Sequence, residues 1–297
     1  CCRVNAMSLR LPFARLDHAD RRQRYPRPEC SVVFTCVCRL APRMAAHRLF
    51  DISGRRALVT GSSRGIGRAF AQGLLEAGCI VVLHGADLDR SRVAAGEMGG
   101  DRVHPVAFDV TDADAVAAGV ADAEAIVGPL DVLVNNVGIQ HRAPLLEFPQ
   151  AAWQRLLDTN LTSAFLVGCE VARGMVARGR GKIINVGSVQ SALARPGIAP
   201  YAATKGGLKM LTQGMCADWA AAGLQINALA PGYIQTELTR ALVEDADFSE
   251  WVHRRTPAAR WGTVDDLVGA LLFLSSPASD FVNGHTLYVD GGMLAVV

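Results

Sequence analysis

A tyrosine and a lysine, Tyr201 and Lys205, stand four residues apart, a spacing that places both side chains on one face of a helix. A free tyrosine has a pKa of about 10 and is a poor base at neutral pH. One ammonium about 4 Å away, at an effective dielectric constant of about 20, supplies roughly the 4 kcal/mol that lowers this pKa by about three units. The pair therefore predicts an acid–base couple in which Lys205 activates Tyr201. The alternative is a buried tyrosine beside a surface lysine.

Two further polar residues stand where they can join this pair. Ser188 follows a buried apolar run, at the strand end where α/β folds bind ligands, and its hydroxyl can hydrogen-bond a substrate oxygen. Asn160 lies in a helical stretch, where its side chain can hold a water molecule. Taken singly, each residue is more typical of a structural role, so their interpretation depends on their sharing one site with Tyr201.

A glycine-rich turn predicts a site for a dinucleotide. Glycines at 61, 65 and 67 lie between the first strand-like run and the first helical stretch. Glycines allow a tight turn and let backbone N–H groups approach a pyrophosphate at a helix N-terminus. A structural turn can use the same residues, but a position between the first strand and the first helix is the one that dinucleotide binding requires.

The residues after the second strand bear on which dinucleotide binds. NAD-binding folds usually place Asp or Glu there, bonded to the ribose hydroxyls. Residues 82–86 contain no acid, and Arg64 in the glycine turn can meet the 2′-phosphate of NADP with charge-assisted hydrogen bonds. The sequence therefore favours NADP. In the alternative, Arg64 is a solvated loop charge and Asp87 turns back to the ribose, which gives NAD.

Short apolar runs alternate with amphipathic stretches throughout the chain after Met44. Continuous Val, Ile and Leu runs are typical of parallel strands covered on both faces. This alternation predicts an α/β fold, a single-domain Rossmann-type doubly wound sheet of seven parallel strands with helices on both faces. The expected strands are 56–60, 79–84, 103–108, 130–134, 182–186, 225–230 and 286–289, and the expected helices are 65–77, 112–127, 153–178, 201–222 and 264–275.

Composition excludes several classes of protein. The chain has 297 residues, half of them apolar and 20% charged, which is too apolar for a disordered chain. No apolar run approaches the roughly 18 residues of a membrane span. Residues 1–43 carry a net charge of +6 and the remainder −4, so the main part of the chain has no basic excess for nucleic acid.

Cysteine and histidine spacing argues against metals and disulfides. Five of the eight cysteines precede Met44 and the other three are scattered, while the seven histidines show no ligand spacing. We therefore expect no metal site and a reduced, cytoplasmic domain.

The first 43 residues differ from the rest. Arg and Pro are concentrated in this segment, which has no periodic hydrophobic pattern and does not begin with Met. We expect a disordered extension foreign to the natural protein, with a dinucleotide-binding dehydrogenase domain over 44–297. The alternative is an Arg-rich transit peptide, against which the acids within this segment argue.

Together these motifs resemble the short-chain dehydrogenase/reductase family over 49–297. The resemblance implies that Ser188 positions the carbonyl or alcohol, that Tyr201 exchanges its proton, that Lys205 lowers the Tyr201 pKa and binds the nicotinamide ribose, and that Asn160 holds a relay water. It also implies a homotetramer with one interface along the helices of 153–178 and 201–222.

The same resemblance implies the cofactor contacts, with Asp109 at the adenine. The implied cofactor-binding residues are Gly61, Ser63, Arg64, Gly65, Ile66, Gly67, Asp109, Asn136, Gly138, Tyr201, Lys205, Pro231 and Gly232. Val137 departs from the pattern, since the family usually has alanine there, and this puts the cofactor affinity in question.

Four segments indicate a substrate. Residues 138–142, 188–191, 256–262 and 280–285 resemble the gluconate 5-dehydrogenases of this family, which implies interconversion of D-gluconate and 5-keto-D-gluconate. Arg142 can grip a carboxylate and Gln190 can bond sugar hydroxyls. Alternatively, Arg142 is a surface charge and Gln190 is a loop residue with no role in binding.

Other functions remain open on the sequence. These are reduction of another ketone or polyol, such as a 3-oxoacyl thioester, and non-catalytic sensing of a dinucleotide. Residues 233–255 predict two short helices over the site, as a lid that orders on binding or as a fixed flap.

Overall fold

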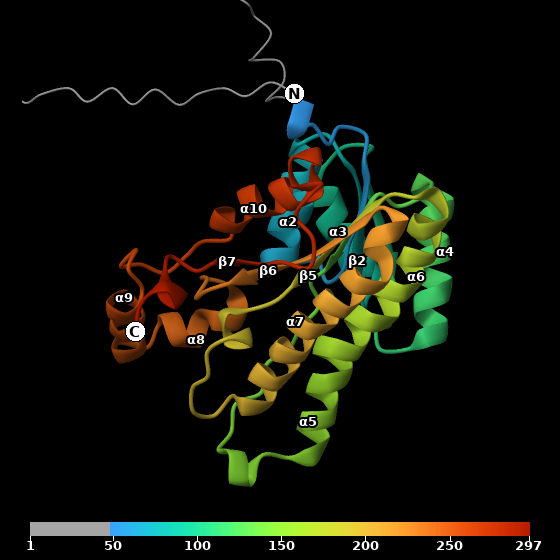
Figure 1. Ribbon diagram of the computed structural model, residues 1–297. Coiled ribbons are helices and arrows are strands. Elements are labelled where there is room, and N and C mark those ends of the chain that lie inside the picture. Colours follow the sequence, from blue (N-terminus) through green and yellow to red (C-terminus); the bar gives the residue numbers. More distant parts are fainter. Residues whose placement is uncertain (1–47) are drawn as a thin grey trace, which may run out of the picture. The chain divides into compact units, whose positions relative to one another are not determined.

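The computed structural model describes residues 48–297, so the expectations for residues 1–43 and for the start of the domain lie outside the described residues. Seven parallel strands form one sheet in the order β3-β2-β1-β4-β5-β6-β7 (Figure 1). The predicted doubly wound fold is confirmed. The strands are β1 Arg56–Val59, β2 Ile80–Gly85, β3 Val103–Ala107, β4 Val132–Asn135, β5 Gly181–Val186, β6 Leu224–Pro231 and β7 Thr286–Val289.

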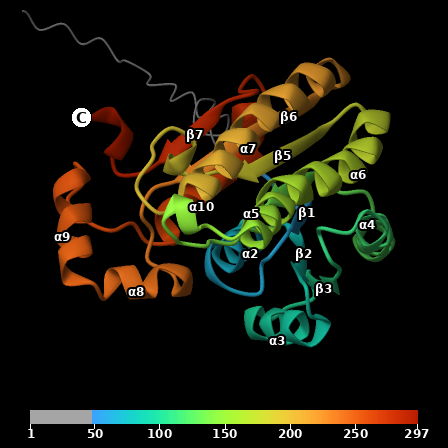
Figure 2. The same ribbon diagram turned by 90° about the horizontal axis from the view of Figure 1, so that it is seen from below.

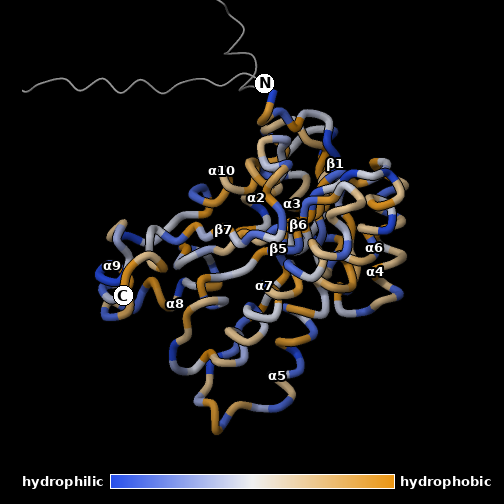
Figure 3. The backbone as a smooth tube through the Cα atoms, viewed as in Figure 1, coloured by the Kyte–Doolittle hydropathy of each residue, from blue (hydrophilic) through white to orange (hydrophobic). Residues whose placement is uncertain are grey.

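Helices cover both faces of the sheet (Figure 2). One core joins the strands to α2 (Gly65–Glu76), α3 (Leu88–Met98) and α10 (Asp265–Ser275), and a second core joins them to α4, α6 and α7. Hydrophobic residues, orange in Figure 3, run through the strand region near β1 and β6. The helices of the second face are α4 Ala113–Val127, α6 Ser163–Arg178 and α7 Ala199–Trp219.

Two helical regions differ from expectation. The stretch expected as one helix over 153–178 consists of α5 (Gln150–Leu157), a π-helical turn (Asp158–Thr162) and α6. The helix α3 was not expected, because its buried residues are only Ser91, Ala94 and Ala95, too small to give a hydrophobic period. No helix in the described part of the chain is long and apolar enough to cross a bilayer.

A chain of buried amides joins the sheet to α7. The Asn135 Nδ2 donates to Asn185 Oδ1 at 3.0 Å, and the Asn185 Nδ2 donates to Thr212 Oγ1 at 3.0 Å. Thr212 in turn donates to the carbonyl of Leu208 in the same helix. Because buried polar groups that lose a partner are costly, this network fixes α7 against β4 and β5.

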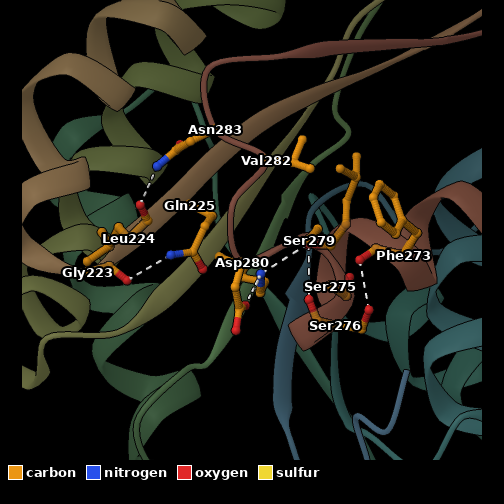
Figure 4. Close-up of polar contacts among 12 residues, drawn as sticks. Gly223, Leu224, Gln225, Phe273, Ser275, Ser276, Ser279, Asp280, Val282 and Asn283 are labelled. Atoms are coloured by element: carbon orange, nitrogen blue, oxygen red, sulfur yellow. Dashed lines mark hydrogen bonds and ion pairs between the residues drawn. The ribbon is translucent and has the colours of Figure 1, made fainter. Parts of the chain in front are cut away.

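The amino ends of β5 and β6 are fastened by the segment before β7, as Figure 4 shows. Asn283 donates to the Leu224 carbonyl at 2.8 Å and accepts from the Ile226 N–H at 2.8 Å. The buried Lys182 forms an ion pair with Asp280 at 2.9 Å. Residues 280–285, part of the resemblance noted above, therefore act at the sheet edge opposite the strand ends considered next.

Two short helices follow β6, as predicted. They are α8 (Arg240–Val243) and α9 (Ala246–Arg255), at the left of Figure 1. The ring of Tyr233 packs edge-on against Phe248, Trp251 and Trp261, with centroid distances of 5.6 to 5.7 Å. This aromatic cluster fixes the helical segment onto the chain that leaves β6.

Candidate active site

The carboxyl ends of the strands collect the candidate residues at one edge of the sheet. The glycine turn leaves β1, residues 136–144 leave β4, Ser188 follows β5 and Gly232 follows β6. The order of the strands reverses between β1 and β4, and ligands of such sheets bind in the crevice at this point. The edge therefore brings together the predicted cofactor and substrate residues.

Ser188 and Tyr201 form the centre of the site. The Ser188 Oγ accepts the Gln190 N–H at 3.1 Å, which orients the hydroxyl and leaves its proton to be donated. The Ser188 side chain lies close enough to the Tyr201 side chain to lower the pKa of the phenol. Two hydroxyls thus converge where one substrate oxygen can accept from both.

The electrostatics of Tyr201 involve several neighbours. Burial raises its pKa; the Ser188 hydrogen bond and the Arg142 guanidinium oppose this effect, while Tyr233 adds to it. The Lys205 Nζ lies 5.9 Å from the centre of the Tyr201 ring and is not among the groups that lower the phenol pKa. In the structure Ser188 and Arg142 favour ionisation of the phenol, and the expected effect of Lys205 on the Tyr201 pKa stays a prediction.

The ammonium of Lys205 is directed to the sheet. Its Nζ is buried and donates to the Val186 carbonyl at 2.8 Å. Burial lowers the Lys205 pKa to about 8, since the charged form loses its hydration. A Cβ built on Gly138 would lie 3.6 Å from this nitrogen, so the loop that follows β4 passes close to the ammonium.

The side chain of Asn160 is fully engaged within the protein. Its Oδ1 accepts the Ile139 N–H at 2.7 Å, and its Nδ2 donates to the Ile139 carbonyl at 3.0 Å and to Thr204 Oγ1 at 3.2 Å. Asn160 stands in the π-helical turn, a geometry frequent at functional sites. It ties the loop after β4 to the helix of Tyr201 and Lys205, and only one Oδ1 lone pair is left for a water.

The glycine turn has the geometry of an anion site. Gly61 and Gly65 have φ of +63° and +57°, which favour glycine. A Cβ on Gly67 would lie 2.4 Å from the Gly61 carbonyl and from Asn136 Nδ2, so the helix packs too closely for any other residue. The α2 N-terminus has no side-chain cap and no acid in its first turn. Its N–H groups are therefore free to bind a phosphate.

A histidine that the sequence analysis missed holds this turn. The His84 Nδ1 accepts the Gly61 N–H at 3.1 Å and its Nε2 lies 3.0 Å from the Phe108 carbonyl, which assigns the neutral ring with hydrogen on Nε2. Burial lowers the His84 pKa to about 4. Its place at the end of the second strand, where an acid was sought, was the available signal.

The predicted adenosine contacts lie at the ends of β2 and β3. Asp109 is exposed, and Thr111 donates two hydrogen bonds that lower its pKa. Ser63 Oγ would lie 3.7 Å from a Cβ on Gly85, at the end of β2. Arg64 is highly exposed and lies 3.6 Å from Glu237, an ion pair of the kind that contributes about 0–1 kcal/mol.

Asp87 does not turn back toward this region. Its carboxylate caps α3 and accepts the Arg90 N–H at 3.0 Å.

The remaining predicted cofactor residues also lie at the carboxyl edge. Ile66 packs on the core from the first turn of α2, Val137 would lie 3.0 Å from a Cβ on Gly61, and Gly232 follows Pro231 and approaches Asp290 too closely for a side chain.

The substrate side of Tyr201 is polar and cationic. Arg142 is exposed in the loop after β4 and acts on the pKa of Tyr201. The Gln190 Nε2 lies 3.5 Å from the Tyr233 hydroxyl, at the limit of a hydrogen bond, and its Oε1 is buried with no partner among the described residues. Sequence reasoning missed Arg195, whose place between Ser188 and Tyr201 was the only signal. Within residues 48–297 no group of His, Cys, Asp or Glu could hold a metal ion.

A glycine turn beside a serine, a tyrosine and a lysine at the switch point of a doubly wound sheet defines a class of nicotinamide-dependent oxidoreductases. Residues 61–294 match the family described as Enoyl-(Acyl carrier protein) reductase. The chain belongs to the short-chain dehydrogenase/reductase family.

Individual relatives extend this match. The chain is 57% identical to the Gluconate 5-dehydrogenase of Gluconobacter oxydans over 82% of its own length and 96% of that protein. It is 49% identical to the 5-keto-D-gluconate 5-reductase of Escherichia coli K12, and the match covers 84% of this chain and 99% of that protein. The crystal structure of a gluconate 5-dehydrogenase from Burkholderia cenocepacia J2315 in complex with NADP and tartrate is 55% identical, with a TM-score of 0.83, covering 85% of this chain and all of that one.

Protonation of His84 should weaken the fold in acid. The unfolded histidine takes up its proton near pH 6.5 and the folded one near pH 4, so its contribution is complete above pH 6.5 and is lost as the pH falls toward 4. Between pH 7 and pH 4 the free energy of unfolding should fall by about 3 kcal/mol more in the wild type than in His84→Gln. Urea unfolding at each pH measures this difference, and parallel curves for the two proteins would contradict it.

Proposed function

We propose that the protein is an NADP-dependent oxidoreductase that interconverts D-gluconate and 5-keto-D-gluconate at C5. The observation that carries this proposal is the 57% identity over nearly the whole length of a gluconate 5-dehydrogenase, in a chain that keeps the Ser188–Tyr201 pair intact. The 5-keto-D-gluconate 5-reductase relative and the gluconate 5-dehydrogenase structure support the same substrate pair.

The residues of the site have distinct proposed roles in the reduction. Ser188 donates a hydrogen bond to the C5 ketone oxygen and orients it. Tyr201 donates its phenolic proton to the same oxygen as negative charge develops there, and the raised pKa of this half-buried phenol keeps it protonated for that purpose. In the oxidative direction Tyr201 takes the proton back. NADPH, when bound, supplies the hydride.

Other residues position these groups. Lys205, held by the Val186 carbonyl, presents its remaining N–H donors to the nicotinamide ribose. Asn160 fixes the loop that carries Gly138, and the relay water proposed beside it has one Oδ1 lone pair available.

The glycine turn fits NADP. Its uncapped helix N-terminus suits the pyrophosphate, and the absence of an acid from 82–86 removes the usual partner of the NAD ribose. The NADP in the Burkholderia structure supports the assignment of this cofactor. Asp87 caps a helix, so the alternative in which it selects NAD has no support in the structure.

The polar substrate side favours a sugar acid over the rival functions. An acyl thioester needs an apolar channel, whereas Arg142 and the unpartnered Gln190 amide oxygen suit a carboxylate and hydroxyls. A non-catalytic sensor would not need Ser188 and Tyr201 to meet.

We also propose that the reaction takes place in the cytoplasm. The three cysteines of the described residues, Cys79, Cys169 and Cys216, are free thiols, and burial raises the pKa of each. Unpaired thiols are typical of reducing compartments.

Removal of the Tyr201 hydroxyl tests the reaction. The wild-type protein should oxidise NADPH when 5-keto-D-gluconate is added, with lower efficiency for NADH and for 3-oxoacyl thioesters. Tyr201→Phe should reduce kcat by about 10²- to 10⁴-fold, since the general acid is lost. Tyr288→Phe, which removes a hydroxyl bonded to Ser191, serves as the control. Its kcat should stay within about threefold of the wild-type value. An unchanged rate in Tyr201→Phe would refute the mechanism.

Arg64 should determine cofactor choice. Arg64→Ala should raise the KM for NADPH by about 10- to 100-fold, as expected for lost hydrogen bonds to a charged phosphate, and leave the KM for NADH unchanged. Arg68→Ala, in the first turn of the helix that Arg64 precedes and paired with Glu97, is the matched control. Equal changes for both cofactors would remove the 2′-phosphate role.

Exposed apolar residues support the homotetramer. Trp153 and Phe165 on α5 and α6 and Met210 on α7 are 38%, 48% and 62% exposed. Light scattering should give four times the chain mass, and Phe165→Asp should shift the population to smaller species. The control Val93→Asp, on exposed α3, should not. A wild-type monomer would contradict the proposal.

A further inference from the structure

Two arginines approach each other beside Tyr201 with no acid between them. Arg142 comes from the loop after β4, and Arg195 from the loop between Ser188 and α7. Arg195 is close enough to contribute, after burial, to a lowered Arg142 pKa. Both also act on Tyr233. Among the described residues no carboxylate forms an ion pair with either guanidinium, so two like charges face one another uncompensated.

Arg195 is held in a fixed orientation. Its Cζ lies 5.3 Å from the centre of the Phe248 ring, and its side chain is close enough to Tyr233 to lower the pKa of that phenol. Tyr233 in turn packs against Phe248, at 5.6 Å between ring centroids. A guanidinium placed over an aromatic face is attracted by the ring and can still donate hydrogen bonds to a planar, bidentate partner.

Unpartnered polar atoms accompany the two arginines. The Arg195 Nε is buried and has no partner among the described residues, and the same is true of Gln190 Oε1 and Gln140 Oε1. One donor and two acceptors left unsatisfied is the pattern that a ligand with a carboxylate and several hydroxyls would complete.

The position of this cluster identifies which charge it meets. The phosphates of a dinucleotide belong at the glycine turn after β1, whereas the charge of Arg142 acts on the Tyr201 phenol, beside which the reacting carbon would be held. The anion is therefore part of the substrate.

We propose that Arg195 is a second substrate-binding residue, which together with Arg142 clamps the carboxylate of the sugar acid while Gln190 and Gln140 accept its hydroxyls. This inference rests on the proposed function and adds the determinant of its specificity. Phe248 orients the guanidinium, so the helical segment after β6 contributes to recognition of the acid group. Uncharged ketoses of the same length lack the partner that two facing arginines require.

Charge-dependent kinetics test the clamp. We compare 5-keto-D-gluconate with its methyl ester, which keeps the carbon skeleton and lacks the charge. Arg195→Gln should raise the KM for the acid by about 10- to 100-fold, the value for a lost charge-assisted pair, and change the KM for the ester and for NADPH by less than about threefold. Arg195→Lys keeps the charge without the planar guanidinium. Its KM for the acid should lie between those of the wild type and of Arg195→Gln.

Two further variants separate recognition from folding. Phe248→Leu keeps apolar volume but removes the ring face, and should raise the KM for the acid several-fold more than for the ester. Arg254→Gln removes a positive charge from α9, where Arg254 pairs with Glu250, and should leave both KM values unchanged. Circular dichroism verifies that each variant is folded. Equal losses for acid and ester in Arg195→Gln, or an unchanged KM for the acid, would overturn the clamp.

Binding without turnover distinguishes this proposal from the function on which it rests. Calorimetry with tartrate and the NADP-loaded protein should show at least tenfold weaker binding to Arg195→Gln than to the wild type. If the wild type binds tartrate through Arg195 but does not reduce 5-keto-D-gluconate, the clamp stands and the substrate assignment fails. If it reduces the keto acid and Arg195→Gln binds tartrate as tightly as the wild type, the clamp fails alone. A wild type that neither turns over nor binds tartrate overturns both.

Discussion

The bond from the Lys205 ammonium to the Val186 carbonyl joins the two halves of the site. Val186 ends the strand that leads to Ser188, and Lys205 lies one helical turn after Tyr201. Burying an ammonium is unfavourable unless it is bonded, so this contact sets how far α7 can move from β5. The distance between the serine and tyrosine hydroxyls follows from it. The amide chain through Asn185 and Thr212 restrains the same helix one layer deeper.

The fold could be predicted from the sequence because buried parallel strands appear as continuous runs of apolar residues. All seven strands lie within two residues of their expected positions. The helix α3 escaped notice because it buries only small residues, and the π-helical turn escaped because its backbone shift does not alter the hydrophobic period. Elements with large apolar faces could be predicted, and those fixed by hydrogen bonding or close approach could not.

In the candidate site too, some features could be predicted from the sequence and others could not. Residue types and spacing found Ser188, Tyr201 and Lys205, but the direction in which a charge acts depends on distances that a linear sequence does not contain. The Lys205 nitrogen bonds to the strand, and the groups that ease ionisation of Tyr201 are Ser188 and Arg142. Arg195 and His84 stood in unremarkable loop and strand positions. Their roles come from neighbours far away in the chain.

The fastening of β5 and β6 by Asn283 and Lys182 lies at the end of the sheet remote from the chemistry. Residues in this region therefore hold the strands together, while the loops at the other end determine what is bound. Because strand assembly and ligand binding occupy opposite ends of the same strands, a change in the binding loops leaves the contacts that hold the strands together in place.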